Sequence, residues 1–164
     1  MTTSTAPAAI TPMTAPTVSR VNFFKAVPKA FKALNGFDLA ANEGLDPGLV
    51  ELIHIRASQI NQCGYCVQAH AADACKAGES EERLHVLPVW REARALFTER
   101  EQAALALTEA VTLIAEHRVP DDVYAQVAAH FDEVELARLI ASICVINTWN
   151  RIAISTGMTA EASA

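Results

Sequence analysis

The sequence has few glycines, few aromatic residues and an excess of negative over positive charge. Six glycines and 6% aromatic residues among 164 are too few for the turn-rich, aromatic-rich pattern of an all-β domain. Lys and Arg number 13 against 19 Asp and Glu, for a net charge of −6, whereas nucleic-acid and anionic-membrane surfaces need clustered basic residues. No apolar run approaches the ~20 residues that span a bilayer. We therefore expect neither a nucleic-acid partner nor a membrane partner.

The chain does contain enough apolar material for one core, because 51% of its residues are hydrophobic and its length suits a single domain. Residues 1–20 are rich in Thr, Ala and Pro and lack the basic start and apolar stretch of a secretory signal. We expect a disordered tail over residues 1–20, a helical domain over 21–156 and a flexible C-terminus over 157–164. We therefore expect a cytoplasmic location, where cysteines seldom form permanent disulfides.

Helix-starting signals recur along this domain. Residues suited to cap a helix N-terminus are Asp46, Asn61, Ser80, Thr98 with Glu101, Asp121 or Asp122, and Asp132 with Glu135. The helices expected after them cover residues 47–60, 62–77, 81–86, 99–117, a short segment after Pro120, and 133–156, closed by Gly157. An earlier helix, interrupted near Pro28, is expected to end at Asn35-Gly36. No alternating strand pattern of useful length is present, so the predicted fold class is all-α.

The segment INQCGYCVQAH, residues 60–70, carries two of the four cysteines and a histidine. Residues three or four apart share a helix face, so Cys63, Cys66 and His70 form one stripe. Cys75 lies on the opposite side of this helix, and Cys144 lies in an apolar run near the C-terminus. We expect both of these to be buried packing residues, as free cysteines commonly are.

Three kinds of site fit the Cys63–Cys66 pair. A zinc site would need His70 and a distant ligand such as Glu51 or His54, since structural zinc usually takes four ligands. A pair of inert core thiols is the second alternative. The third, which we favour, is a redox couple: a helix start favours a negatively charged thiolate, His70 is placed to accept the Cys66 proton, and the two thiols can close a disulfide.

Glu51 is a candidate partner for the His70 ring. It lies on the preceding helix among Leu49, Leu52 and Ile53, where a carboxylate is costly unless it is paired. If the two helices pack antiparallel, Glu51 could orient the imidazole and stabilise its charged form. The alternative is an exposed carboxylate favoured only by its position near the helix start.

Glu51, Gln59 and the segment INQCGYCVQAH together resemble the carboxymuconolactone decarboxylase family, in its alkylhydroperoxidase AhpD-like branch. Framing segments such as VPKAFKAL and NTWNRIAIS agree, so the resemblance covers about residues 21–156. It implies an AhpD-like helical bundle that assembles into trimers or hexamers. It also implies a peroxidase that reduces hydroperoxides through a CxxC dithiol and is restored by an external dithiol or thiol-protein reductant, with no cofactor or metal.

The resemblance assigns the catalytic relay to Glu51, Cys63, Cys66 and His70, with Cys66 attacking peroxide and Cys63 resolving it. A thioredoxin-like order, with Cys63 attacking, is the alternative; we favour Cys66 because His70 lies one turn away. Tyr65 departs from the family, whose characterised enzymes carry a histidine there; a phenol with pKa near 10 is no base at neutral pH. Two other functions remain open: a disulfide reductase or thiol relay without useful peroxidase activity, and a metal- or ligand-binding oligomer. The sequence offers further candidates for auxiliary or pocket-lining roles, namely Tyr65, Gln59, His54, Trp149, Asn150 and Arg151.

Overall fold

The structure, a computed structural model, describes residues 20–160, and within that range it contains helices and no strand. The α-helices are α1 (Phe23–Ala26), α2 (Pro28–Asn42), α3 (Pro47–Ile60), α4 (Gly64–Lys76), α5 (Glu81–Val86), α6 (Glu99–Thr112), α7 (Ile114–His117), α8 (Asp121–Ala128) and α9 (Glu133–Thr156). Short 3₁₀ turns, η1 (Leu87–Val89) and η2 (Arg94–Leu96), link α5 to α6. The prediction of an all-α fold is confirmed. The predicted tail over 1–20 and C-terminus over 157–164 fall mostly outside the described residues.

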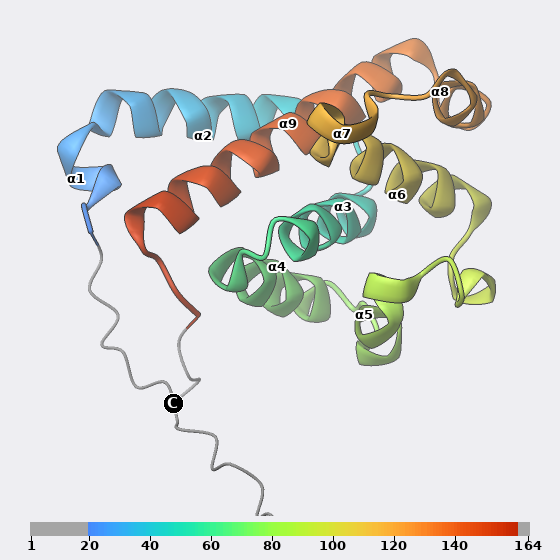
Figure 1. Cartoon of the computed structure of the whole chain (residues 1–164), viewed down its shortest axis with the longest axis horizontal. Coiled ribbons are helices and arrows are strands. Elements are labelled where there is room, and N and C mark those ends of the chain that lie inside the picture. Colours follow the sequence, from blue (N-terminus) through green and yellow to red (C-terminus); the bar gives the residue numbers. More distant parts are fainter. Residues whose placement is uncertain (1–19, 161–164) are drawn as a thin grey trace, which may run out of the picture.

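Helix α3 forms the centre of the bundle and packs against α4, α6 and α9 (Figure 1). More than half of its residues are buried, among them Leu52, Ile53 and Ile55, as expected for a helix that is apolar on most sides. One hydrophobic cluster joins Ile53 to α6 and α9, and another joins Leu52 and Ile55 to Trp90 near η1. Elements on both sides therefore hold α3 in place.

The capping signals identify most helix starts correctly. The Asp46 carboxylate accepts the Leu49 N–H at 2.9 Å, and the Ser80 hydroxyl accepts the Arg83 N–H. Both predicted capping boxes, Thr98 with Glu101 and Asp132 with Glu135, are formed. Gly157 ends α9 in the left-handed conformation, at φ 75°, which glycine adopts without steric cost.

One predicted helix end and one predicted uninterrupted helix are wrong. Helix α2 continues through Asn35-Gly36 to Asn42, because its second half is held to α9: the Trp149 indole donates to Asp38 at 2.9 Å. A glycine costs an exposed helix only about 1 kcal/mol, which such packing offsets. The predicted helix over 99–117 is instead divided at Leu113 into α6 and α7.

Glu109 on α6 connects three parts of the bundle. Its carboxylate accepts hydrogen bonds from Arg56 of α3, from the Trp90 indole and from Arg91. Burial alone would raise the pKa of Glu109, but these three donors bring it below its ordinary value. A charged carboxylate is thus the form that the fold stabilises.

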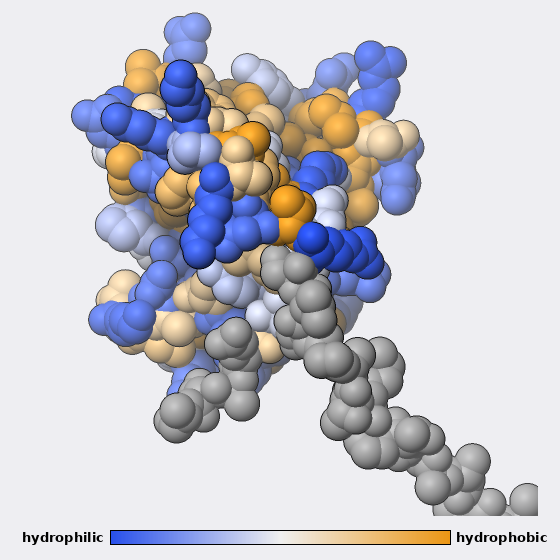
Figure 2. Space-filling model, turned by 90° about the vertical axis from the view of Figure 1, so that its left-hand side faces the viewer, coloured by the Kyte–Doolittle hydropathy of each residue, from blue (hydrophilic) through white to orange (hydrophobic). Residues whose placement is uncertain are grey.

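The molecular surface exposes some large hydrophobic side chains. On the face that carries α1, hydrophobic residues stand between hydrophilic ones (Figure 2). In and next to α1, the side chains of Val21, Phe24 and Val27 are exposed. Leu39, on α2, is 71% exposed. Separately, none of the helices in the described part of the chain has the length and apolar character that a bilayer span requires.

Candidate functional site

The candidate site begins at the tight turn between α3 and α4. Asn61 ends α3 rather than capping α4, which corrects the predicted boundary: α4 starts at Gly64, and Cys63 is its N-cap residue. Gln62 makes the turn with a φ of 59°, a left-handed conformation that is unfavourable for a residue with a Cβ. The turn brings α4 back along α3, so that residues on the two helices face each other.

Both cysteines of the pair are buried and reduced. Cys63 is 2% exposed and Cys66 5%. The Cys63 sulfur accepts the Cys66 backbone N–H at 3.4 Å, in place of the oxygen that usually caps a helix. The two sulfurs pack with Ala153 of α9 and Met158, so the end of α9 and the segment after it cover them.

His70, one turn beyond Cys66 on α4, is bonded to Glu51 of α3. The distance from His70 Nδ1 to Glu51 Oε2 is 2.9 Å, so the expected contact between these side chains is present, and the alternative of an unpaired Glu51 is wrong. An ionised carboxylate can only accept a hydrogen bond, so Nδ1 carries the proton. The Nε2 lone pair is then left free to accept a proton, which is the tautomer that a general base requires.

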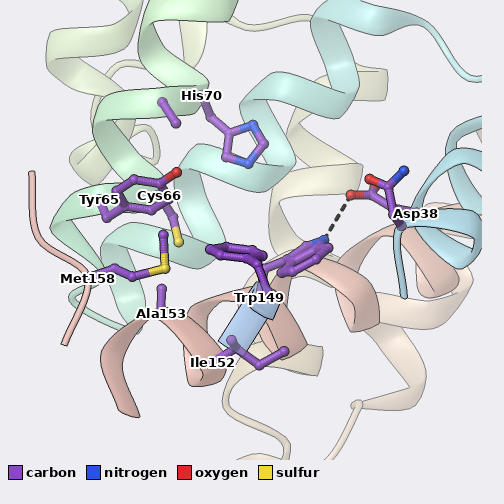
Figure 3. Close-up of a pocket in the computed structure, with 11 residues that line it drawn as sticks. Asp38, Tyr65, Cys66, His70, Trp149, Ile152, Ala153 and Met158 are labelled. Atoms are coloured by element: carbon purple, nitrogen blue, oxygen red, sulfur yellow. Dashed lines mark hydrogen bonds between the residues drawn. The ribbon is translucent and has the colours of Figure 1, made fainter. Parts of the chain in front are cut away.

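Cys66 and His70 share a cavity of about 240 Å³. The Cys66 sulfur and the His70 ring both point into it (Figure 3). Most of the remaining wall is apolar and comes from Phe24, Ala69, Trp149, Ile152, Ala153 and Met158, with Asn35, Asp38 and Tyr65 as the other polar residues. The cavity can therefore admit a small molecule with an apolar group and present it to both the sulfur and the imidazole.

The acidity of Cys66 differs from the expectation. Burial, followed by the hydrogen bond with Cys63, raises the pKa of the Cys66 thiol to about 12, although a hydrogen bond from Asn150 acts in the opposite direction. The helix start does not make this thiol acidic. Cys66 consequently needs a base to become a thiolate at neutral pH, and His70 is the base that shares its cavity.

His54 is buried behind His70. It is 3% exposed, its ring meets the His70 ring edge to face at 4.7 Å, and its Nε2 lies 3.0 Å from Ser142 Oγ. Burial, and then the nearby His70, lower the pKa of His54 to about 3. This histidine is therefore neutral at physiological pH and cannot act as a second base.

The other predicted residues have mixed outcomes. Tyr65 lines the cavity and is 39% exposed, whereas Gln59 is not among the residues lining it. Trp149 forms part of the cavity wall, but Arg151 bonds to Asn147 and does not line it.

The expectation of burial for the other two cysteines is wrong. Cys75 and Cys144 are both exposed. Cys75 does lie on the face of α4 opposite Cys66, as predicted, but that face is turned to solvent. Cys144 lies between the buried residues Ile143 and Val145, on the outward side of α9, so an apolar sequence neighbourhood does not imply an inward side chain.

Two residues of the site had no sequence signal. Asp38 lines the cavity and holds Trp149, which is 111 residues away in the sequence, and Met158 covers the cysteines from beyond α9. Both owe their positions to tertiary packing. Helical spacing within one segment cannot reveal such contacts.

The zinc alternative lacks a ligand set in the described part of the chain. Across residues 20–160, no group of three or more His, Cys, Asp or Glu side chains is arranged to hold a metal ion. The Glu51 carboxylate is instead bonded to His70.

Comparison with known proteins identifies a matching family and similar individual proteins. The model of the carboxymuconolactone decarboxylase family matches residues 25–110. The uncharacterised protein YdfG of Bacillus subtilis is 38% identical over 139 residues, covering 84% of this chain and 94% of YdfG. The alkyl hydroperoxide reductase AhpD of Coxiella burnetii is 40% identical over 53 residues, which is 32% of this chain and 30% of that protein.

A solved structure has the same fold. It is a protein of unknown function from Agrobacterium tumefaciens, provisionally named as an AhpD antioxidant defence protein. It superposes with a TM-score of 0.85 at 38% identity, covering 89% of this chain and all of its own. These relatives suggest a peroxidase-like antioxidant role.

Proposed function

The chain belongs to the carboxymuconolactone decarboxylase family, in its AhpD-like branch, and from this we propose that it is a thiol-dependent peroxidase. Its substrate would be a hydroperoxide small enough for the Cys66 cavity. Its reductant would be an external dithiol or a thiol protein. Glu51, Cys63, Cys66 and His70 would carry out the reaction.

One observation carries the proposal: a buried sulfur and a carboxylate-held imidazole open onto the same small cavity. A thiolate is the form of cysteine that attacks peroxide, and the Cys66 thiol does not ionise by itself because burial raises its pKa. His70 Nε2, with its lone pair free, supplies the missing base. The apolar part of the wall favours an organic group on the peroxide.

The first half of the cycle transfers oxygen to sulfur. His70 takes the Cys66 proton, and the sulfur attacks the terminal oxygen of ROOH. The O–O bond breaks, Cys66 becomes a sulfenic acid, and the alkoxide leaving group takes the proton back from His70 to give ROH. Glu51 stabilises the positive imidazolium while it holds that proton.

The second half restores the thiols. The Cys63 sulfur attacks the Cys66 sulfenic acid, which forms the disulfide and releases water. An external dithiol then reduces the disulfide by exchange and is itself oxidised. Each turnover therefore consumes one peroxide and two thiol groups.

The burial of both sulfurs favours this function over a thiol relay between proteins. Cys63 and Cys66 are only 2% and 5% exposed, so in this reduced state neither residue is accessible to a protein disulfide, whereas a small peroxide fits the cavity. Reduction by a thiol protein would act on the disulfide form and would require that form to expose the pair. The disulfide-reductase alternative requires a more accessible attacking sulfur.

Steady-state turnover of the purified protein tests the proposal. With dithiothreitol as reductant, we expect an organic hydroperoxide to be consumed faster than a small model disulfide. Cys66→Ser should reduce peroxide turnover to the background rate, and Cys75→Ser, at an exposed cysteine of the same helix, should leave it unchanged. Retained turnover in Cys66→Ser would exclude Cys66 as the nucleophile, and faster disulfide reduction would favour the relay function.

A further inference from the structure

Helix α9 carries a buried amide beside the cysteine pair. Asn150 is fully buried. Its side-chain oxygen accepts a hydrogen bond from Asn61 Nδ2 at 2.8 Å, and its Nδ2 donates to Ser58 Oγ at 2.9 Å. The two partners belong to the last turn and the C-cap of α3, immediately before Cys63, and they fix the orientation of the amide.

The position of Asn150 on α9 directs it toward Cys66. Ala153, one helical turn further, packs in one cluster with Cys63 and Cys66, and residues three apart share a helix face. An amide NH₂ group has two protons, and the bond to Ser58 uses one of them. In agreement with this placement, the Asn150 side chain lowers the pKa of the Cys66 thiol against the larger effect of burial.

The α9 residues that line the cavity do not offer a donor to the sulfur: the Trp149 indole N–H is bonded to Asp38, and the Ile152 and Ala153 side chains are apolar. The titratable groups that line the cavity with Cys66 are Asp38 from α2 and Tyr65 and His70 from α4. Helix α9 contributes Trp149, Ile152 and Ala153 to the lining, none of which titrates.

We propose that Asn150 is a further catalytic residue, whose Nδ2–H donates to the Cys66 sulfur and stabilises its thiolate. The catalytic part of this inference rests on the proposed peroxidase function. Asn150 would act when His70 removes the Cys66 proton, and again when reduction of the disulfide releases Cys66 as a thiolate. A neutral amide suits both moments, because it donates to the thiolate without taking part in proton transfer.

Alkylation of Cys66 tests the inference without any peroxide. In a background with Cys63→Ser, Cys75→Ser and Cys144→Ser, Cys66 is the one remaining cysteine, and its reaction with iodoacetamide is followed as a function of pH. Asn150→Leu removes the donor at similar volume. We expect about tenfold slower alkylation below the thiol pKa, the equivalent of a pKa higher by about one unit.

The matched control is Asn147→Leu, one turn earlier on α9. Asn147 is also a buried amide bonded to Asn61, but its own NH₂ group donates to Thr112 and to the Ile143 carbonyl. We expect this variant to alkylate at the parent rate. A decrease equal to that of Asn150→Leu would overturn the inference, because it would show a general effect of disturbing the amide network.

A second variant keeps the test decisive if Asn150→Leu fails to fold. Asn150→Asp preserves the volume and the oxygen that accepts from Asn61, but it cannot donate and its charge opposes a thiolate. We expect alkylation to slow by more than in Asn150→Leu. Slower alkylation of Cys66 in the Asn150 variants supports the donor role, even if the protein does not reduce peroxide. Alkylation at the parent rate in a folded Asn150 variant overturns the donor role, even if the protein does reduce peroxide.

Discussion

At the scale of single residues, burial determines the chemistry of Cys66 more than its place in a helix does. A helix N-terminus favours a negative charge by about 0.3–1 kcal/mol, whereas removing a charged group from water costs several kcal/mol. The balance is a pKa of about 12 for Cys66. Sequence position reveals the first effect and not the second, so the acidic thiol expected from the sequence was wrong.

The Glu51–His70 contact yields a prediction about catalysis. Glu51→Gln keeps a hydrogen-bonding group near Nδ1 but removes the charge that stabilises the imidazolium. We expect kcat/KM for an organic hydroperoxide to fall on the order of 10²-fold, which is the lower end of the range for the loss of general base catalysis. The rate of peroxide consumption measures this effect. Glu82→Gln, at an exposed carboxylate on α5, should have no effect. Equal rates for the two variants would show that Glu51 has no role in proton transfer.

At the scale of helices, the local signals could be read from the sequence and the contacts between helices could not. Caps such as Asp46 and Ser80 bond to residues three positions away, so their pattern is contained in a short segment. The end of α2 was misread because the Asp38–Trp149 bond that extends it joins two distant segments. Asn61 was misread for the same reason: its side chain bonds to Asn147 and Asn150 of α9.

The same principle explains how much of the site was predictable. Cys63, Cys66 and His70 could be grouped because they lie within one helical stretch of eight positions. Glu51 could be proposed from its cost of burial, although its contact with His70 depended on how α3 and α4 pack. The cavity wall from α2 and α9 follows only from tertiary packing, and so does the bonding of Asn150.

The turn between α3 and α4 gives a prediction about stability. Gln62 adopts φ 59° and its side chain is exposed, so Gln62→Gly should raise the free energy of unfolding by roughly 0.5–1 kcal/mol. The matched change Ala72→Gly, on the exposed side of α4, should lower it by about 1 kcal/mol. Chemical denaturation measures both. A loss of stability in Gln62→Gly would mean that the side chain makes a contact worth more than the strain.

At the scale of the whole molecule, α3 supports both the fold and the site. It forms part of both large hydrophobic clusters, and it presents Glu51, His54 and Ser58 to the neighbouring helices α4 and α9. Disturbance of these polar residues should therefore affect stability as well as chemistry. The homo-oligomer, trimer or hexamer, stays a prediction, with the exposed apolar residues of α1 and α2 as candidate contacts.

Acid sensitivity of the fold is the prediction at this scale. Unfolded His54 takes up a proton near pH 6.5, but folded His54 does so only near pH 3. Between these values the unfolded state binds more protons, so the stability is present above pH 6.5 and falls by about 1.4 kcal/mol for each pH unit below it. Glu109, with its lowered pKa, adds to this loss only below about its ordinary value of 4.5.

Equilibrium unfolding across this pH range provides the measurement. His54→Phe should remove most of the decline between pH 6.5 and 4.5, because phenylalanine does not titrate. His117→Gln, at an exposed histidine, should retain it. An unchanged slope in His54→Phe would assign the acid sensitivity to other groups.

The most direct test of the central claim is the mass of the protein after one equivalent of an organic hydroperoxide. We predict that Cys63→Ser gains one oxygen atom, located on Cys66, because the sulfenic acid has no resolving thiol. The wild type should instead lose two hydrogen atoms as the Cys63–Cys66 disulfide closes, and Cys66→Ser should show neither change at residue 63. An oxygen atom on Cys63 in the Cys66→Ser variant, with Cys66 unmodified in Cys63→Ser, would contradict the account.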